Sequence, residues 1–338
     1  MTATKRRVGV VMGGASGERE VSLRSGQAVL EALRERGWDA VPVVLGPGVD
    51  AATALRLSRV EVAFLALHGR LGEDGCVQGL CELVGVPYTG SSVLASALAM
   101  DKAKAKELFR LHNVPTPSSY LIDERDDLAD LEELHGGFGF PVMVKPCHEG
   151  SSLGLARANT MAELATAVER ALEHDRKVLV ERLVRGREVT VGLLDGRVLG
   201  CLEVAPRGGV YDYEAKYTPG LTEYFVPARI GATRQRGVLN LAERAARALG
   251  CTGAVRVDLM VSDDENEVVL EVNTLPGMTT TSLLPRIAAA AGYDFGQLCE
   301  AIVEGATLHN QGARRRTRPQ VAAAVESLDL TSAVAANE

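Results

Sequence analysis

The first hundred residues alternate between continuous apolar runs and an amphipathic stretch. Apolar runs near 7–12, at 41–45 and at 62–67 predict buried strands, and the spacing of apolar residues near 18–36 predicts a helix. Strands that alternate with helices form a parallel sheet with the helices packed on it. We therefore expect a Rossmann-like α/β unit at the N-terminus.

A lysine-rich helix and a pair of prolines divide the rest of the chain. The helix near 102–117 runs into VPTP, and beyond it the apolar strands PVMVK and KVLVE flank a helix near 161–173. Longer strands, a tyrosine-rich loop and two helices follow, and the last residues show no amphipathic period. We expect an N-terminal substrate domain at 1–102, a central domain at 103–186, a C-terminal domain at 187–311 and a mobile tail at 312–338.

A strand pair at 256–273 carries the most informative polar pattern. If its polar SDDEN turn is centred between Asp264 and Glu265, Asp258 lies opposite Glu271. The same register places Arg256 opposite Asn273. Opposed carboxylates destabilise a strand pair unless a positive charge lies between them, and Mg²⁺ takes such oxygen ligands alongside substrate phosphates. The pair thus predicts a hard cation and a nucleotide; the alternative, a solvated edge hairpin, is disfavoured by the apolar residues between the polar ones.

The bulk composition is that of a globular protein and narrows the class of partner. Of the 338 residues 46% are hydrophobic and 24% charged, and no apolar run has the length of a membrane-spanning helix or of a signal-peptide core. A net charge of −7 argues against a general nucleic-acid binder, although a local basic pocket can still hold Mg·ATP. Six cysteines without a CxxC pair fit reduced thiols better than zinc ligands or disulfides. We expect a cytoplasmic protein with neither membrane nor nucleic-acid partners.

Two loops after N-terminal strands hold candidate substrate residues. In GGASGEREVS a strand ends in glycines and a helix opens at Glu18, whose carboxylate could hold a substrate ammonium group. In LALHGRLGEDG a buried strand ends at His68, at the sheet edge where ligands collect in open α/β sheets. A structural tight turn and a strand-capping histidine are the respective alternatives.

The segment PVMVKPCHEGSSLG has the features of a lid over a polyphosphate. Lys145 closes a strand, and the small hydroxyl and glycine residues of 149–154 follow it. A plain β-turn would not need a lysine at this position. Farther on, Glu181 ends an apolar strand and Glu188 begins the next, where they could accept hydrogen bonds from an adenine amine and from ribose hydroxyls.

Two further loops complete the set of candidates. Four of the chain's seven tyrosines lie within 211–224, which points to a closing loop that excludes water, with Lys216 and Tyr217 as its functional members. Aromatic packing within a long surface loop is the alternative. In EVNTLPGMTTTSLL the Gly277 N–H could donate to an oxyanion, and the helix start near Ser282 could bind a carboxylate.

Read together, these segments closely resemble the D-alanine–D-alanine ligases of the ATP-grasp superfamily, from about Arg7 to about His309. The resemblance rests on the ordered motifs GGxSxEREVSLxSG, ALHGRxGEDGxxQG, PYTGSS, MDK, VKPxxEGSSLG, YDYEAKY, RVD and EVNTLPGMT. It implies three domains, with ATP between two antiparallel sheets of the central and C-terminal domains and D-alanine where all three domains meet. It also implies a homodimer.

The resemblance assigns roles to the residues that match its motifs. It implies phosphate contacts at Lys102, Lys145, Ser151 and Lys216, nucleoside contacts at Glu181, Leu183 and Glu188, and two Mg²⁺ ions, replaceable by Mn²⁺, at Asp258, Glu271 and Asn273. Glu18, Ser151 and Tyr217 match a hydrogen-bonded catalytic set, and Arg256 with Gly277 matches the oxyanion contacts. Glu18 and His68 match the site of the first D-alanine, and Ser282 with Leu283 matches the carboxylate site of the second.

The implied activity is ATP-dependent ligation of two D-alanine molecules through a D-alanyl phosphate, for peptidoglycan precursor synthesis. A ligase of the same fold with D-serine or D-lactate as second substrate is the nearest alternative, although Tyr217 argues against D-lactate. A catalytically silent nucleotide-binding protein would have no physical reason to keep opposed carboxylates, and a carboxylating enzyme would need a biotin-type segment. The chain departs from the family pattern at Arg182, where a lysine is common, and Cys147-His148 fills a variable pair.

Overall fold

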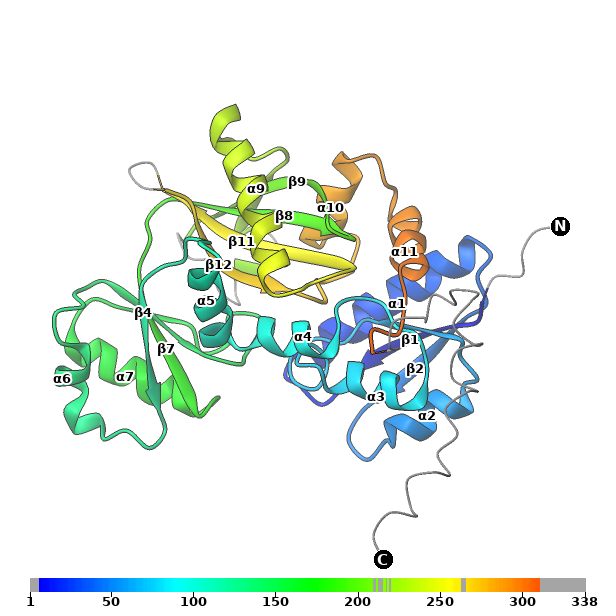
Figure 1. Cartoon of the computed structure of the whole chain (residues 1–338), viewed down its shortest axis with the longest axis horizontal. Coiled ribbons are helices and arrows are strands. Elements are labelled where there is room, and N and C mark those ends of the chain that lie inside the picture. The colour runs from blue at the N-terminus through cyan, green and yellow to red at the C-terminus, as the bar shows by residue number, and fades with distance from the viewer. Residues whose placement is uncertain are drawn as a thin grey trace, which may run out of the picture. The chain divides into compact units, whose positions relative to one another are not determined.

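The computed structural model describes residues 6–208, 211, 215, 216, 218, 220–262 and 266–310. Its first sheet is parallel, in the order β2-β1-β3 (Figure 1). The strands are β1 (Val8–Gly13), β2 (Ala40–Leu45) and β3 (Val62–Leu65), and α1 (Arg19–Glu35) joins the first two. The Rossmann-like start predicted from the apolar pattern is confirmed.

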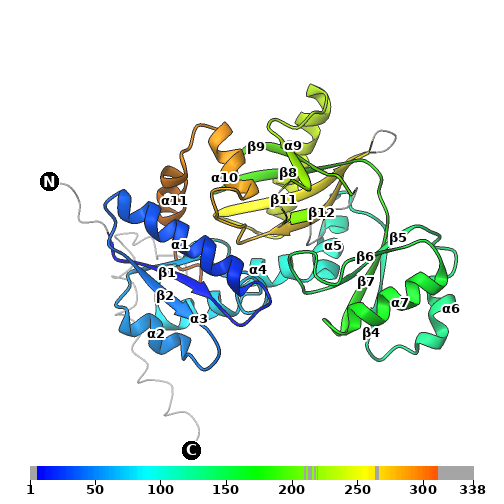
Figure 2. The ribbon, with the colours of Figure 1, turned by 180° about the vertical axis from the view of Figure 1, so that it is seen from behind.

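The alternation of side chains along β1 explains why helices cover both faces of this sheet. Val8 and Val10 are fully buried in a core with α1, whereas Val11 belongs to the core on the opposite face. That second core contains α2 (Ala51–Leu57) and α3 (Cys76–Val84). Figure 2 shows α11 (Phe295–Glu304) beside α1, and the two helices share the first core.

The second sheet is antiparallel, in the order β4-β7-β5-β6. Its strands are β4 (Ser119–Asp123), β5 (Val142–Pro146), β6 (Ala156–Ala158) and β7 (Lys177–Arg182), with a core formed by α7 (Met161–Leu172), η1 (Leu128–Asp130) and α6 (Leu131–His135). Before it come α4 (Val93–Met100) and α5 (Lys102–Leu111). The predicted lysine-rich helix is confirmed as α5, which ends at Leu111, just before Asn113 with its positive φ of 54° and the prolines that follow.

The third sheet is also antiparallel, in the order β10-β9-β8-β11-β12. Its strands are β8 (Arg187–Leu194), β9 (Arg197–Pro206), β10 (Thr222–Phe225), β11 (Ala254–Val261) and β12 (Val268–Asn273). One face packs against α9 (Ala232–Ala248) and α5, and the other against α10 (Leu283–Ala290). In the part of the chain that the structure describes, every helix is too short or too polar to cross a membrane.

The register predicted for β11 and β12 is confirmed at the polar positions. Asp258 pairs with Glu271, and Arg256 pairs with Asn273. After Asp258 the pairing shifts by one residue, so that Leu259 lies opposite Val269 and Leu270 is the extra residue of a β-bulge. The regular register of this strand pair therefore ends at Asp258. The bulge lies directly beside the opposed carboxylates.

Three sequence predictions concern residues outside those described. They are the centre of the SDDEN turn, Tyr217 and the tail from residue 312.

A close contact between two glycines joins the loop after α3 to the third sheet. Gly253 precedes β11, and a Cβ built on it would lie 2.7 Å from the Gly90 Cα. Both glycines have positive φ, 70° for Gly253 and 96° for Gly90. The Ser91 hydroxyl reinforces the junction, since it donates to Thr252 O at 2.9 Å and accepts from Thr252 N at 3.1 Å. Strand β11 therefore starts from a backbone position that only glycine fits.

We predict that Gly253→Ala lowers the free energy of unfolding by about 3 kcal/mol, because a strained positive φ is added to a clash with backbone atoms. Gly250→Ala is the matched control, since Gly250 has a similar φ of 71° but open space around its Cβ position. The control should lose only about 1–2 kcal/mol. Urea unfolding measures both variants, and equal losses would contradict the close-contact explanation.

Candidate active site

Two neighbouring cavities form the candidate site. The first, of about 340 Å³, lies between the second and third sheets and is lined by residues of β5, β7, β8, β9, β11 and β12. The second, of about 480 Å³, is lined by the loops after β1 and β3, by the β11–β12 pair and by the start of α10. The residues that line both cavities are Gly150, Ser151, Tyr211, Lys216 and Glu271. These residues would contact a molecule bound in either cavity.

The Asp258 carboxylate lies among positive and polar groups. Arg256 donates to it from Nε at 3.0 Å and from Nη2 at 2.9 Å. Thr190 Oγ1 donates at 2.7 Å, and Asn273 Nδ2 donates at 3.1 Å. Burial would lower the pKa of Arg256, but Asp258 raises it, so the guanidinium stays charged. These donors replace the water that the buried carboxylate has lost.

Lysines hold the facing carboxylate, Glu271, in its ionised form. Burial would raise the pKa of Glu271, but Lys102, Lys216 and Lys145 lower it to about 2. The Lys102 Nζ lies 3.6 Å from Glu271 Oε2. The positive charge that two opposed carboxylates require is therefore supplied in part by the chain's own side chains.

The donor set of the strand pair suits a hard divalent cation. Asp258 lines the first cavity, Asn273 the second, and Glu271 both. Mg²⁺ prefers carboxylate and amide oxygens of this kind and shares them with substrate phosphates. The predicted metal ligands are thus brought together and fit Mg²⁺ held with a nucleotide.

A cluster of two lysines and one carboxylate adjoins the first cavity, which two of its members, Lys145 and Glu181, line. Glu181 on β7 forms ion pairs with Lys145 at the end of β5 and with Lys106 on α5. Burial would raise the pKa of Glu181, but the two ammonium groups lower it. Burial lowers the pKa of Lys106 to about 8 despite this partner. Lys106 was not among the predicted site residues, although it follows Lys102 by one turn of the lysine-rich helix.

The other end of the first cavity is more apolar. Leu183 and Glu188, two predicted nucleoside contacts, line it together with Met143, Met260 and Leu270. Burial raises the pKa of Glu188 to about 8, with a contribution from Asp258. An apolar slot with one polar acceptor suits a planar base and its ribose.

The β5–β6 loop, residues 147–155, connects the two cavities. Its Ser151 hydroxyl donates to Glu18 Oε1, and Ser152 Oγ donates to Tyr211 O at 3.1 Å. Both serines have positive φ, 47° and 58°, which costs free energy unless surrounding contacts fix it. The predicted link between Glu18 and Ser151 is present in the structure. Tyr217, the predicted third member of that set, lies outside the described residues.

His68 and a second acidic residue line the second cavity at the end of β3. The buried imidazole lies 3.2 Å from Ser25 Oγ through its Nε2, and burial lowers its pKa to about 4. Glu73 accepts a hydrogen bond from Gly69 N at 2.7 Å, and burial together with Glu18 raises its pKa to about 8. Glu73 was not predicted, although it belongs to the GEDG stretch after His68.

The far wall of the second cavity is the loop from β12 to α10. Gly277, Ser282 and Leu283 all line it, as predicted. Ser282 is the residue before α10, and its hydroxyl accepts from Thr279 N at 3.1 Å. The open N–H groups at a helix start suit a carboxylate.

The fold and site together define a class of protein. Two antiparallel sheets enclose a lysine-lined cavity with an acidic strand pair at one edge, and a loop of small residues reaches from that cavity to a second one. This is the ATP-grasp arrangement for a nucleotide-using ligase.

Comparison with known proteins narrows this class to a family. A family model described as D-ala D-ala ligase C-terminus matches residues 113–304, and one described as D-ala D-ala ligase N-terminus matches residues 46–91. A D-alanine–D-alanine ligase of Anaeromyxobacter sp. (strain K) is 50% identical over 307 residues, which cover 91% of this chain and 99% of that protein. The chain therefore belongs to the D-alanine–D-alanine ligase family.

Solved structures agree with this assignment. The D-alanine–D-alanine ligase of Bacillus anthracis matches with a TM-score of 0.76 and 35% identity, over 89% of this chain and 97% of that chain. The same ligase complexed with ATP matches with a TM-score of 0.76 and 34% identity, over 90% of this chain and 97% of that chain. The VanG D-Ala:D-Ser ligase of Enterococcus faecalis matches with a TM-score of 0.78 and 30% identity, over 89% of this chain and 99% of that chain.

We predict that His68 stays neutral in the folded protein down to about pH 4, because burial lowers its pKa to about 4. The unfolded chain takes up this proton near pH 6.5, so the contribution of His68 to the free energy of unfolding falls as the pH drops from about 6.5 to about 4. Unfolding of the wild type and of His68→Asn at pH 7 and pH 4.5 tests this. The wild type should lose about 2–3 kcal/mol more than the variant between these pH values; equal losses would contradict a buried neutral imidazole.

Proposed function

We propose that this chain joins two D-alanine molecules into D-alanyl-D-alanine, coupled to cleavage of ATP into ADP and phosphate. The observation that carries the proposal is the pair of cavities with shared lining residues. The first cavity suits a nucleotide and the second suits amino acids, while Ser151, Lys216 and Glu271 belong to both. A phosphoryl group could therefore pass from one bound molecule to the other without leaving protein contacts.

The first step is phosphoryl transfer to a carboxylate. An ATP base would occupy the apolar end of the first cavity, with its phosphates toward Lys102, Lys145 and Lys216. The carboxylate oxygen of the first D-alanine attacks the γ-phosphorus, ADP leaves, and a D-alanyl phosphate forms. Glu18 and His68 line the cavity where its ammonium group would lie. Because the ammonium is positive, Glu18 is the residue suited to hold it.

The second step is attack by an amine. The amine of the second D-alanine adds to the carbonyl carbon of the acyl phosphate, and the tetrahedral intermediate collapses with loss of phosphate and a proton. Arg256 and the Gly277 N–H line the cavity and are suited to stabilise the oxyanion. The start of α10 at Ser282 and Leu283 would bind the carboxylate of the second substrate.

Two Mg²⁺ ions at Asp258, Glu271 and Asn273, replaceable by Mn²⁺, would neutralise charge on the phosphates during transfer. The chain's own contribution is to keep Glu271 ionised and to hold Asp258 in place. Lys102 and Lys145 lower the pKa of Glu271, and Arg256 holds the Asp258 carboxylate in two hydrogen bonds.

We also propose a division into three domains at 1–102, 103–186 and 187–311, one for each sheet. The first break falls at the first residue of α5 and the second falls between β7 and β8, so no strand is interrupted. The packing of α11 on α1 would then tie the C-terminal domain to the N-terminal one. We expect a homodimer that acts in the cytoplasm, where ATP is available, and supplies peptidoglycan precursor synthesis.

The protein should release phosphate from Mg·ATP only when D-alanine is present. Product mass should identify D-alanyl-D-alanine, including in mixtures with D-serine or D-lactate. A preferred mixed product would move the specificity to that second substrate, and no release with any of them would contradict the proposed function.

Glu271→Gln should reduce turnover by at least about 100-fold, because the amide removes one negative charge from the proposed metal ligands. The melting temperature of Glu271→Gln should change little, because the substitution also removes the repulsion between two paired carboxylates. Glu223→Gln is the matched control, because Glu223 lies on β10 with 58% of its side chain exposed. Wild-type turnover by Glu271→Gln would refute the metal assignment.

A further inference from the structure

We propose that His148 is a positioning residue for ATP binding, because its side chain fixes the root of the β5–β6 loop against the start of α5, the helix that carries Lys102. The inference rests on the proposed function, in which this loop and Lys102 hold the nucleotide phosphates.

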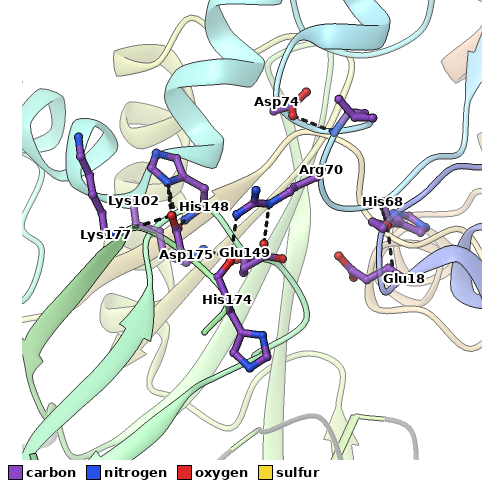
Figure 3. Close-up of polar contacts among 12 residues, drawn as sticks. Glu18, His68, Arg70, Asp74, Lys102, His148, Glu149, His174, Asp175 and Lys177 are labelled. Carbon is purple, nitrogen blue, oxygen red and sulfur yellow. Dashed lines mark hydrogen bonds and ion pairs between the residues drawn. The ribbon is translucent and has the colours of Figure 1, made fainter. Parts of the chain in front are cut away.

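The contacts of His148 join three segments that are distant in sequence. Its backbone N donates to Asp175 Oδ2 at 2.6 Å, and its Nδ1 lies 2.9 Å from the same oxygen. Its Nε2 lies 3.2 Å from Asp101 Oδ2. Asp175 directly precedes the segment that enters β7, and Asp101 caps α5 by accepting from Lys104 N at 2.9 Å. Figure 3 shows His148 and Asp175 side by side near Lys102.

The charges around His148 favour the protonated ring. Hydrogen bonds to Asp101 and Asp175 raise the pKa of His148 to about 9, against the effect of burial. Burial would raise the pKa of Asp101, but hydrogen bonds from His148, the Lys104 N–H and the Cys147 thiol together lower it. Other titratable groups near this place include Lys102 and Lys104, on α5, and the Cys147 thiol, whose pKa burial raises to about 12. An imidazolium between two carboxylates can hold both, whereas a neutral ring has one donor only.

Fixing the loop root also fixes Lys102 relative to the loop. The Lys102 backbone N donates to Cys147 O at 3.1 Å, and its Nζ donates to Glu149 O at 2.6 Å. From the side of the first sheet, Arg70 Nε donates to Glu149 Oε1 at 2.7 Å and its Nη2 donates to His174 O at 3.0 Å (Figure 3). The side chain of Arg70 is 54% exposed, so its ion pair with Glu149 contributes little. The contact between His148 and the buried Asp175 therefore holds the loop more strongly.

The backbone conformation at the tip of the β5–β6 loop depends on contacts that hold the root of the loop in place. Ser151 and Ser152 both adopt positive φ, a conformation that non-glycine residues keep only when other contacts hold it. Without the contacts of His148 the loop would sample other conformations, and part of the nucleotide binding energy would be spent on ordering it. ATP affinity should therefore weaken more than D-alanine affinity.

A transition-metal site is the competing interpretation of the same residues. One ligand atom each from Asp101, Cys147 and His148 lies within 4.8 Å of the others. A metal would need a neutral imidazole and a thiolate. The ion-pair interpretation is favoured because both ring nitrogens already face carboxylate oxygens at hydrogen-bonding distance.

The test compares His148→Gln with the wild type and with His112→Gln, a control in which an exposed histidine at the end of α5 is changed. Calorimetry with a non-hydrolysable Mg·ATP analogue should show about tenfold weaker binding for His148→Gln, the size expected for one lost charge-assisted contact. The KM for D-alanine should stay within about twofold in all three proteins, since no contact to that site is removed. Amide hydrogen exchange of residues 147–155 should be faster in His148→Gln alone.

Two further measurements keep the proposal testable if His148→Gln does not fold. Asp101→Asn retains a capping side chain but removes the charge, and it should weaken analogue binding in the same direction. NMR titration of His148 should give a midpoint near pH 9 in the wild type and a lower one in Asp175→Asn.

Three outcomes would overturn the proposal. The first is analogue affinity and loop exchange in His148→Gln that equal those of His112→Gln, and the second is a wild-type midpoint near 6.5. The third is tight stoichiometric binding of Zn²⁺ that is lost in Cys147→Ser and His148→Gln. None of these readouts needs turnover, so failure of this inference is distinguishable from failure to form D-alanyl-D-alanine.

Discussion

The rest of this site depends on one electrostatic constraint, the pair of carboxylates that face each other across β11 and β12. Two like charges at a directly paired position would separate the strands in a bare sheet. Here Arg256 donates a hydrogen bond to Asp258, and Lys102 Nζ lies 3.6 Å from Glu271 Oε2. Lys102 comes from α5 and reaches the strand pair from outside the sheet. The chain is therefore folded so that distant segments bring positive charge to this point.

The same constraint explains why the two cavities adjoin. The positive side chains that stabilise Glu271 are also suited to stabilise phosphates, so a nucleotide bound in the first cavity would lie beside the acidic strands. The β5–β6 loop closes over this place and touches Glu18 through Ser151. Its serines keep strained backbone angles, which is characteristic of functional loops that must adopt one conformation over a ligand. In the proposed reaction, phosphoryl transfer would take place where the two cavities share lining residues.

Local patterns were predictable from the sequence, and long-range partnerships were not. The pairing of Asp258 with Glu271 followed from period-two alternation about a polar turn, which needs no knowledge of the fold. The bulge beside them did not follow, since a one-residue shift depends on packing with neighbouring strands. Lys145 was predicted because it ends an apolar strand before a glycine-rich loop. Lys106 was missed because its ion-pair partner, Glu181, lies on β7, far along the chain from α5.

In the proposed reaction a carboxylate of D-alanine receives the phosphoryl group of ATP where the two cavities adjoin. Isotope transfer tests it most directly. If the enzyme turns over D-alanine labelled with ¹⁸O in its carboxylate, each phosphate released should carry one ¹⁸O atom, because the bond from carbon to the bridging oxygen breaks when the amine attacks. Phosphate without label, formed together with the dipeptide, would contradict the acyl phosphate and with it this account of the site.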